Sequence, residues 1–412
     1  MTVYCGIDWA ERHHDIAVVD EHGQLIAKGR IGDDLEGFTT LVEMLAAAGD
    51  TADEPIPVAI ETPRGLLVAA LRASGRRVYS INPMAVARYR ERYSVSRKKS
   101  DHADAMVLAN ILRTDIHAHR PLPADSELVQ AVAVLARAHQ DATWRRTRAS
   151  NELRSLLREY FPVFLDAFVG RKGNLTSAEA RAVLAIAPRP AVAAKLSRAR
   201  IAAALRRAGR QRGVDGLAAE LQQALRRPQL RQLPMVEDAM GTQALALLAT
   251  LNVECASVDQ LAEAVSAAFR QHPDHAIVTS FPGLADVTGA RILAEIGDDR
   301  SRFADARALK AYAGSAPVTR ASGRSISITH RKVKNDRLAA AGYIWAFVAA
   351  THAEPAKQHY QRRRDHGDRH PAALRNLFNR LLGCLHHCLA TGQVYDPARA
   401  FPAPAAAYAP PM

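Results

Sequence analysis

Four carboxylates, set at the ends of predicted strands and at the start of one helix, constrain this chain more than any other feature. Asp101 and Asp104 open an apolar helical run that continues through residues 106–112. Acids at i and i+3 lie on one face of a helix, and near its start the helix dipole and free backbone N–H groups favour negative charge. Simple N-capping explains this pair equally well, with Asp101 as the cap and Asp104 as a first-turn acid.

Two further acids favour a functional site over capping alone. Asp8 ends the apolar segment 3–7, and Glu61 ends the apolar segment 57–60. Both segments are typical of buried strands. Four carboxylates that converge on one edge of a sheet would form a site for a divalent metal ion.

The first 82 residues predict a sheet covered on both faces. Residues 14–20 and 24–27 read as strands joined by a turn at 21–23. Two helices, 35–48 and 65–73, then alternate with strands at 57–61 and 77–81. A hairpin followed by alternating helices and strands indicates a mixed sheet. This layout, with acids at the strand ends, resembles an RNase H-like nuclease core.

Charge and composition indicate a polyanionic partner. The 412 residues predict two or three domains, and the net charge of +13 favours nucleic acid as the partner. Residues 141–235 contain 19 Lys/Arg against 7 Asp/Glu. Four cysteines form no disulfide framework, and neither a signal peptide nor an apolar run of membrane-spanning length is recognised. We therefore expect a cytoplasmic protein.

Two basic segments are candidate contacts to the nucleic-acid backbone. The segment 89–99 precedes the acidic helix and is read as a loop; it would act as a phosphate clamp or be a solvated basic loop. Its tyrosines, Tyr89 and Tyr93, would stack on bases or simply pack. Helices expected at 128–157, 241–251 and 258–269 suit a dimerising arm, whose basic face would be a backbone groove or a solvated surface. The candidate contacts are Arg97, Lys98, Lys99, Arg206, Arg207 and Arg210.

Near the C-terminal end, a Ser-Gly turn lies among cations. Ser322 and Gly323 are surrounded by basic side chains that could hold a phosphate, although a plain basic hairpin loop has the same composition. The Pro-Gly turn in 280–296 resembles the phosphate-gripping hairpin of helix-hairpin-helix modules, and a simple helix–helix turn is the alternative. The basic residues around the serine are Arg320, Arg324, Arg331 and Lys332.

Several short motifs together resemble the DEDD transposases. These are insertion-sequence recombinases related to pilin-gene invertases, and some are guided by a bridge RNA. The resemblance covers roughly residues 1–140 and 275–395. Its motifs are Gly6-Ile7-Asp8, Ile60-Glu61-Thr62, Ile81-Asn82-Pro83 and Lys99-Ser100-Asp101-x-x-Asp104-Ala105.

The resemblance implies a fold in three parts. An α/β RuvC-like (RNase H-like) domain with a mixed sheet and helices would span residues 1–124. A helical, partly coiled-coil, basic arm would span 125–272, and a mainly α transposase domain with the helix-hairpin-helix-like turn and the serine loop would span 273–395. The Pro/Ala-rich residues 396–412 are expected to be a disordered tail.

The resemblance also implies the chemistry. Mg²⁺ would be bound by the four acids, and Ser322 would attack the scissile phosphate to form a phosphoserine–DNA link, with Ser325 as the competing candidate. Donor and target DNA, a bridge RNA and further copies of the chain, as a dimer or tetramer, are the implied partners. Lys334 stands where the family usually has a glycine, and no histidine can be assigned as a proton shuttle.

Two other functions stay open. In a metal-dependent, structure-specific nuclease water would be the attacking group and Ser322 would be incidental. An inactive DNA- or RNA-binding relative is the other alternative, which the intact acids argue against. A zinc site at Cys384 and Cys388 would need four ligands, and no second pair accompanies them.

Overall fold

The chain folds into two compact units, residues 1–124 and 125–412. The computed structural model describes all residues except 1, 94–100, 172–173, 324 and 403–412, and in addition leaves the side chains of residues 92, 93 and 101 undescribed. Each unit is considered by itself. The division after residue 124 falls where the first predicted domain ends.

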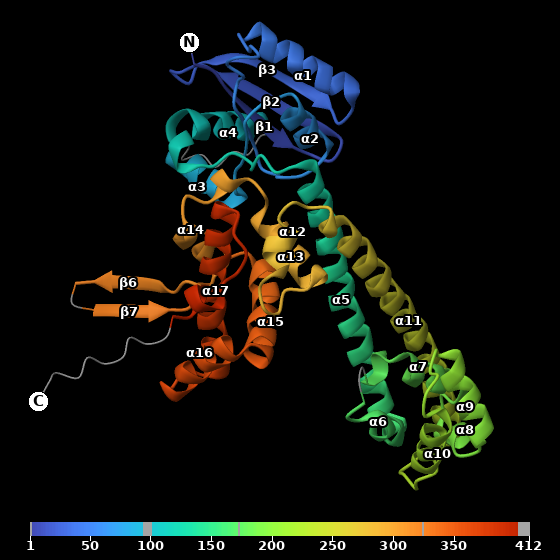
Figure 1. Cartoon of the computed structure of the whole chain (residues 1–412). Coiled ribbons are helices and arrows are strands. Elements are labelled where there is room, and N and C mark those ends of the chain that lie inside the picture. The colour runs from blue at the N-terminus through green and yellow to red at the C-terminus, as the bar shows by residue number, and fades with distance from the viewer. Residues whose placement is uncertain (1, 94–100, 172–173, 324, 403–412) are drawn as a thin grey trace, which may run out of the picture. The chain divides into compact units, whose positions relative to one another are not determined.

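The first unit is built on a five-stranded mixed sheet with the order β3-β2-β1-β4-β5 (Figure 1). β2 pairs antiparallel with both β1 and β3, whereas β4 pairs parallel with β1 and β5. The predicted α/β fold with a mixed sheet is therefore confirmed. The strands are β1 (Tyr4–Trp9), β2 (His13–Val19), β3 (Leu25–Gly32), β4 (Val58–Ile60) and β5 (Val78–Ser80).

Helices cover both faces of this sheet because alternate side chains on the central strands point to opposite sides. Ile7 and Ile60 belong to the core that includes leucines of α1 (Leu35–Ala47) and α2 (Leu66–Ala73). Ala59, the neighbour of Ile60, belongs instead to a second core. That core includes residues of α3 (Pro83–Tyr93) and α4 (Asp101–Asp115), and a short 3₁₀ turn, η1 (Ile116–Ala118), follows α4.

The expected basic loop at 89–99 begins as a helix instead. Residues 83–93 form α3, in which Val86 is buried and the Tyr89 hydroxyl is 3.2 Å from the carbonyl oxygen of Asn110 and 3.1 Å from the Thr114 hydroxyl. Packing onto α4 is therefore the structural role of Tyr89, as the simpler interpretation held. Arg97, Lys98 and Lys99 lie outside the described residues.

The second unit is mainly helical, as expected, and its longest elements are α5 (Glu127–Tyr160) and α11 (Pro234–Arg270). They pack antiparallel: Val132 shares a core with Val265, and Arg145 pairs with Glu254 at 2.9 Å. Figure 1 shows the two helices side by side. The two helices expected at 241–251 and 258–269 are thus one, because the chain between them is helical and the buried Cys255 faces the core.

Helix α11 has the length and composition of a membrane-crossing helix. Helices in the cores of water-soluble proteins can have the same length and composition. Here one face of α11 packs on α5 and carries buried side chains, including the carboxylate-bearing Glu237, which accepts hydrogen bonds from Arg231 at 2.7 Å. The length of α11 is therefore explained by its packing within the second unit.

A group of short helices closes the far end of the α5–α11 pair. Their apolar side chains form one core with the second half of α5 and the first half of α11. The helices are α6 (Pro162–Phe168), η2 (Asn174–Thr176), α7 (Ala178–Ile186), α8 (Pro190–Ala193), α9 (Arg198–Arg207) and α10 (Val214–Leu225).

The remaining helices form a core around Trp345 that also takes in the first turns of α5 and the last turns of α11. The predicted boundary near residue 272 therefore falls within one compact unit, just after α11. Residues 338–350 and 372–390 lie in buried helices, as predicted. The elements are α12 (His275–Thr279), α13 (Asp286–Ile296), η3 (Arg300–Arg302), α14 (Ala306–Tyr312), α15 (Asp336–His352), α16 (Glu354–Asp365), α17 (His370–Thr391) and α18 (Pro397–Ala400).

The Pro282-Gly283 turn is a packing element. Its flanking residues Phe281 and Leu284 are buried, and a methyl group at Gly283 would lie 3.0 Å from the carbonyl oxygen of Trp345. Asp286 in the first turn of α13 already pairs with His275 at 2.9 Å. The helix–helix turn thus fits the structure better than a phosphate-gripping hairpin.

The first residues of the expected disordered tail are ordered instead. Residues 397–400 form α18, and the Phe401 ring lies 5.5 Å from the ring of His359. The Arg380 guanidinium also lies over the Phe401 ring, 5.2 Å from its centroid. Residues up to 402 therefore belong to the folded second unit, and residues 403–412 lie outside the described residues.

Candidate active site

Asp8 and Glu61 end two neighbouring parallel strands. β1 and β4 are paired in register, with Ile7 opposite Ile60, so the next residue of each strand reaches the same edge of the sheet. Both acids are half-buried. The pairing brings together the two acids that the sequence placed at strand ends.

Helix α4 lies against the same face of the sheet as these acids. Gly6 of β1 touches α4 so closely that an added methyl group would lie 2.0 Å from the carbonyl oxygen of Ala105. Since side chains two residues apart share a face, Asp8 lies on the α4 side with Gly6. Glu61, directly after β4, continues the same alternation from Ala59, which packs against α4.

Asp104 lies on α4, the helix that covers this face of the sheet. Its carboxylate, on the first turn of α4, is 4% exposed and forms an ion pair with Arg90 of α3. The oxygen that contacts Arg90, Oδ1, is buried and has no other partner among the described residues. A buried carboxylate needs a cation nearby, and Arg90 supplies one. Asp101 begins α4, three residues before Asp104, and its side chain is outside the described part of the chain.

One acid on this face was missed by the sequence interpretation. Asp15 of β2 is paired directly opposite Asp8, is 7% exposed, and accepts two hydrogen bonds from Arg30, at 2.9 and 3.2 Å. Strand register, which brings Asp15 beside Asp8, was the missing information. Arg30 balances the negative charge of Asp15, so this buried carboxylate does not need a metal ion.

The acid cluster suits a hard divalent cation in its ligand type. Carboxylate oxygens are the ligands that Mg²⁺ takes in proteins. Among the described side chains, no three His, Cys, Asp or Glu residues form a metal-binding group. Asp8, Glu61 and Asp104 therefore do not form such a group by themselves, and the side chain of Asp101 is outside the described part of the chain. What fits a cation here is the type of donor, since carboxylates of Asp8, Glu61 and the α4 acids belong to one face of the sheet, and Asp104 already shares its charge with Arg90.

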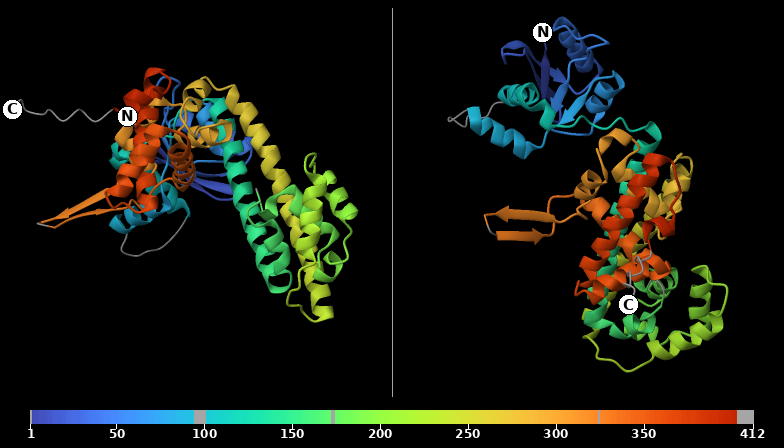
Figure 2. Two further views of the ribbon diagram at one scale, coloured as in Figure 1. Left: turned by 60° about the horizontal axis from the view of Figure 1, so that its bottom comes forward. Right: turned by 60° about the vertical axis from the view of Figure 1, so that its left-hand side comes forward.

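Ser322 lies at the tip of an exposed hairpin in the second unit. β6 (Val318–Ser322) and β7 (Ser325–Thr329) pair antiparallel, and Figure 2 shows them extending away from the helices. Gly323, in the two-residue turn, has φ of +56°, which is a left-handed conformation that favours glycine. The second turn residue, Arg324, is not among those described.

The hairpin has one polar and one apolar face. Ser322 is paired with Ser325 and Arg320 with Ser327, and directly opposed side chains lie on the same face. The other face carries Ala321, Ile326 and Ile328, of which the two isoleucines are 70% and 71% exposed. Both candidate nucleophiles and Arg320 are thus displayed together, while Arg331 and Lys332 follow the end of β7.

Comparison with known proteins identifies the family. Two transposase family models match, one for DEDD transposases of the IS110 type at residues 5–162 and one for the IS116/IS110/IS902 family at residues 275–361. A protein of Streptomyces coelicolor, described as a transposase of the IS117 mini-circle, is 60% identical over 97% of each chain. The chain belongs to the IS110 family of transposases.

Two further relatives cover the transposase from end to end. A 43.6 kDa protein of insertion element IS110 from Streptomyces coelicolor is 28% identical over 96% of this chain and 95% of its own. A 42 kDa protein of insertion element IS900 from Mycobacterium paratuberculosis is 29% identical over 96% and 98%. The match confirms an enzyme that cuts and rejoins DNA. The pilin-invertase relationship and the serine nucleophile remain predictions.

The two matched segments coincide with the two halves of the candidate site. The first includes Asp8, Glu61, Asp101 and Asp104, and the second includes Ser322. In the transposase these belong to separate compact units: the acids to residues 1–124 and the serine to residues 125–412.

The predicted arm contacts are partly engaged within the arm itself. Arg206 lies 3.5 Å from Asp215, and Arg210 lies 3.4 Å from Glu179. Arg207 is exposed at the end of α9. Exposed ion pairs are weak, so phosphates could replace these acids. Nucleic-acid binding by the three arginines stays a prediction.

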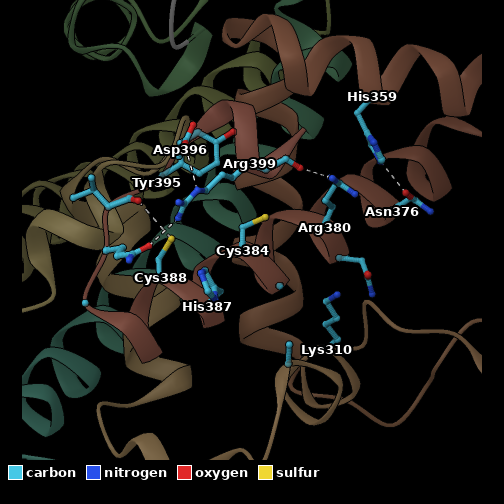
Figure 3. A pocket seen from close by; sticks show the side chains of 17 residues that line it. Lys310, His359, Asn376, Arg380, Cys384, His387, Cys388, Tyr395, Asp396 and Arg399 are labelled. Carbon is cyan, nitrogen blue, oxygen red and sulfur yellow. Dashed lines mark hydrogen bonds and ion pairs between the residues drawn. The ribbon is translucent and has the colours of Figure 1, made fainter. Parts of the chain in front are cut away.

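Cys384 and Cys388 line a cavity of about 1090 Å³ in the second unit. Figure 3 shows both thiols and His387 on α17, with Lys310 and Arg380 nearby. Burial raises the pKa of both thiols, which keeps them protonated. Since no described group of three metal-binding side chains exists, zinc has no support here.

Gly6→Ala tests the tight contact that holds α4 over the sheet. The new methyl group would meet backbone atoms at 2.0 and 2.4 Å, so α4 and its Asp104 must move. Overpacking typically costs about 1–3 kcal/mol, and we expect at least that loss of stability in urea unfolding, together with slower DNA cleavage. In the control, Gly29→Ala, the methyl group meets only the flexible end of Met44. Wild-type cleavage by Gly6→Ala would show that the α4 position is not critical.

Proposed function

We propose that this transposase cuts and rejoins DNA through a serine nucleophile, with Mg²⁺ held by Asp8, Glu61, Asp101 and Asp104. The observation that carries the proposal is the convergence of Asp8, Glu61 and the Asp104 helix on one face and edge of the sheet. When bound there, Mg²⁺ would supply charge stabilisation to the phosphoryl oxygens. This site is the RuvC-like (RNase H-like) core that the family resemblance implies.

Ser322 is the proposed attacking group. Its oxygen would form a bond to the scissile phosphorus, the bond from phosphorus to a DNA sugar oxygen would break, and that oxygen would leave as a hydroxyl. Rejoining reverses the exchange: a DNA hydroxyl attacks the phosphoserine and the serine is released. A serine hydroxyl is a weak nucleophile, so the cations Arg320 and Arg324 would help by binding the non-bridging oxygens.

The location of the two groups supports an oligomer. Acids and serine belong to separate units, so a working site can be assembled from two copies of the chain. The antiparallel α5–α11 pair, the proposed coiled-coil part of the arm, would be the dimerising element. The arm arginines and the segment with Arg97, Lys98 and Lys99 would bind nucleic-acid backbone, and a bridge RNA is the proposed guide. All of this would take place in the cytoplasm.

A metal-dependent nuclease is the alternative that one observation favours. No described side chain hydrogen-bonds the Ser322 hydroxyl, and the hairpin that carries it is exposed. Water could therefore be the attacking group.

A covalent-adduct assay separates the two functions. The full chain is incubated with Mg²⁺ and with end-labelled DNA that carries the end of the element, and the products are separated under denaturing conditions. We expect label that stays with the protein and disappears on protease treatment, because a phosphoserine link survives denaturation. Cleaved DNA without linked protein, at every time point, would contradict the serine mechanism and support the nuclease.

A further inference from the structure

A small cavity lies at the base of the serine hairpin. Its volume is about 160 Å³, enough for a few water molecules or one phosphodiester group. Ser315 lies just before β6 and His330 just after β7, and both line the cavity. Arg375 and Phe378 of α17 form the opposite wall. We call it the hairpin-base cavity.

Positive charge in this cavity is only partly neutralised. Arg375 is half-buried and forms no ion pair or hydrogen bond with any described residue. Lys334 is paired with Asp336 at 2.6 Å. The pKa of His330 lies below its usual value, first because of desolvation and then because of the charges of Arg375, Lys334 and Lys332.

Packing fixes the position of Lys334 at the cavity wall. Its methylene groups rest on Gly314, where an added methyl group would lie 2.2 Å from the Lys334 Cδ atom. Gly314 has φ of +72°. Lys334 thus uses the space left by the missing side chain of Gly314, and it adds a cation to the cavity lining.

We propose that the hairpin-base cavity binds a backbone phosphate of the DNA strand that Ser322 attacks, with Arg375 as the principal contact. The inference rests on the proposed function of Ser322. The four residue steps from Val318 to Ser322 span about 13 Å, at ~3.3 Å per residue. Phosphates of one strand are spaced about 3.4 Å along a duplex axis. Arg375 is then a positioning residue, which sets the strand roughly four phosphates from the serine.

The salt dependence of DNA binding tests this contact directly. Binding of a mixed-sequence duplex is measured by fluorescence anisotropy at several salt concentrations, with Ser322→Ala as the parent so that cleavage plays no part. Each phosphate contact contributes about 0.9 to the slope of log K against log salt. We expect Arg375→Ala to reduce that slope by about 0.9 and Arg375→Lys to restore it.

Arg362→Ala is the matched control. Arg362 is exposed on the neighbouring helix α16, and its replacement changes the net charge as much as that of Arg375 does. The salt slope of Arg362→Ala should therefore equal that of the parent. Equal slopes for Arg375→Ala and Arg362→Ala would overturn the proposal. The proposal would also be overturned if Arg375→Ala reduced the salt slope for single-stranded RNA but not for duplex DNA. The cavity would then bind RNA. Neither result depends on whether Ser322 forms an adduct. The covalent-adduct assay tests the role of Ser322 on its own.

Discussion

Glu61→Gln is expected to abolish DNA strand cleavage in Mg²⁺ while leaving DNA binding intact. The amide keeps the shape of the carboxylate but removes the negative charge that a divalent cation needs. Glu61 is directly adjacent in register to Asp8, so one lost charge weakens the whole cluster. Asp101→Asn should have the same effect, because the two acids at the start of α4 act with the strand-end acids. Cleavage of labelled DNA and anisotropy binding curves measure the two properties.

The matched control is Glu36→Gln in the first turn of α1. Glu36 is exposed and belongs to the same unit, but α1 covers the opposite face of the sheet. It should cleave DNA at the wild-type rate. Binding should persist in all three variants, because none of them alters a basic residue. Full cleavage by Glu61→Gln would contradict the metal site.

The positions of the acids, at strand ends and at a helix start, could be predicted because they depend on local patterns. Apolar runs end at Asp8 and Glu61, and the spacing of Asp101 and Asp104 places both on one helix turn. Parallel pairing of the two strands then follows from the alternating order of helices and strands. The close approach of α4 could not be predicted, because it depends on the absence of a side chain at Gly6.

The parts that were missed depend on contacts between distant segments. α3 carries four charged residues, so its sequence was typical of a loop. It is a helix in the structure, where Val86 and Tyr89 pack on α4. The sequence predicted two helices, 241–251 and 258–269, where the structure has the single helix α11. Its partner α5 begins more than a hundred residues earlier and supports it along both halves.

Strand register was the other missing information. The sequence showed a serine among arginines, but only the pairing of β6 with β7 places Ser322, Ser325 and Arg320 on one face. The same pairing leaves Ile326 and Ile328 exposed on the other face. A hairpin without a core of its own is marginally stable alone. We therefore expect its conformation to depend on what binds it, which the proposed DNA complex would provide.

Ser322→Ala is expected to lose both DNA cleavage and the covalent protein–DNA adduct, and to keep nucleic-acid binding. The substitution removes only the hydroxyl at the tip of an exposed hairpin, so it leaves the folded units and their basic residues unchanged. Ser325→Ala is the closest control that the chain offers, because Ser325 is directly opposite Ser322 on the same face. It should retain measurable cleavage and adduct.

The two serine variants decide between three mechanisms in one experiment. If Ser325→Ala loses the adduct and Ser322→Ala keeps it, the nucleophile is Ser325, and the family motif has been aligned three residues away from the true position. If both variants cleave at the wild-type rate, water attacks the phosphate and the transposase uses its acids as a nuclease does. Loss confined to Ser322→Ala leaves the serine as nucleophile, because the two hydroxyls share a strand pair and a face and differ only in their side of the Gly323 turn.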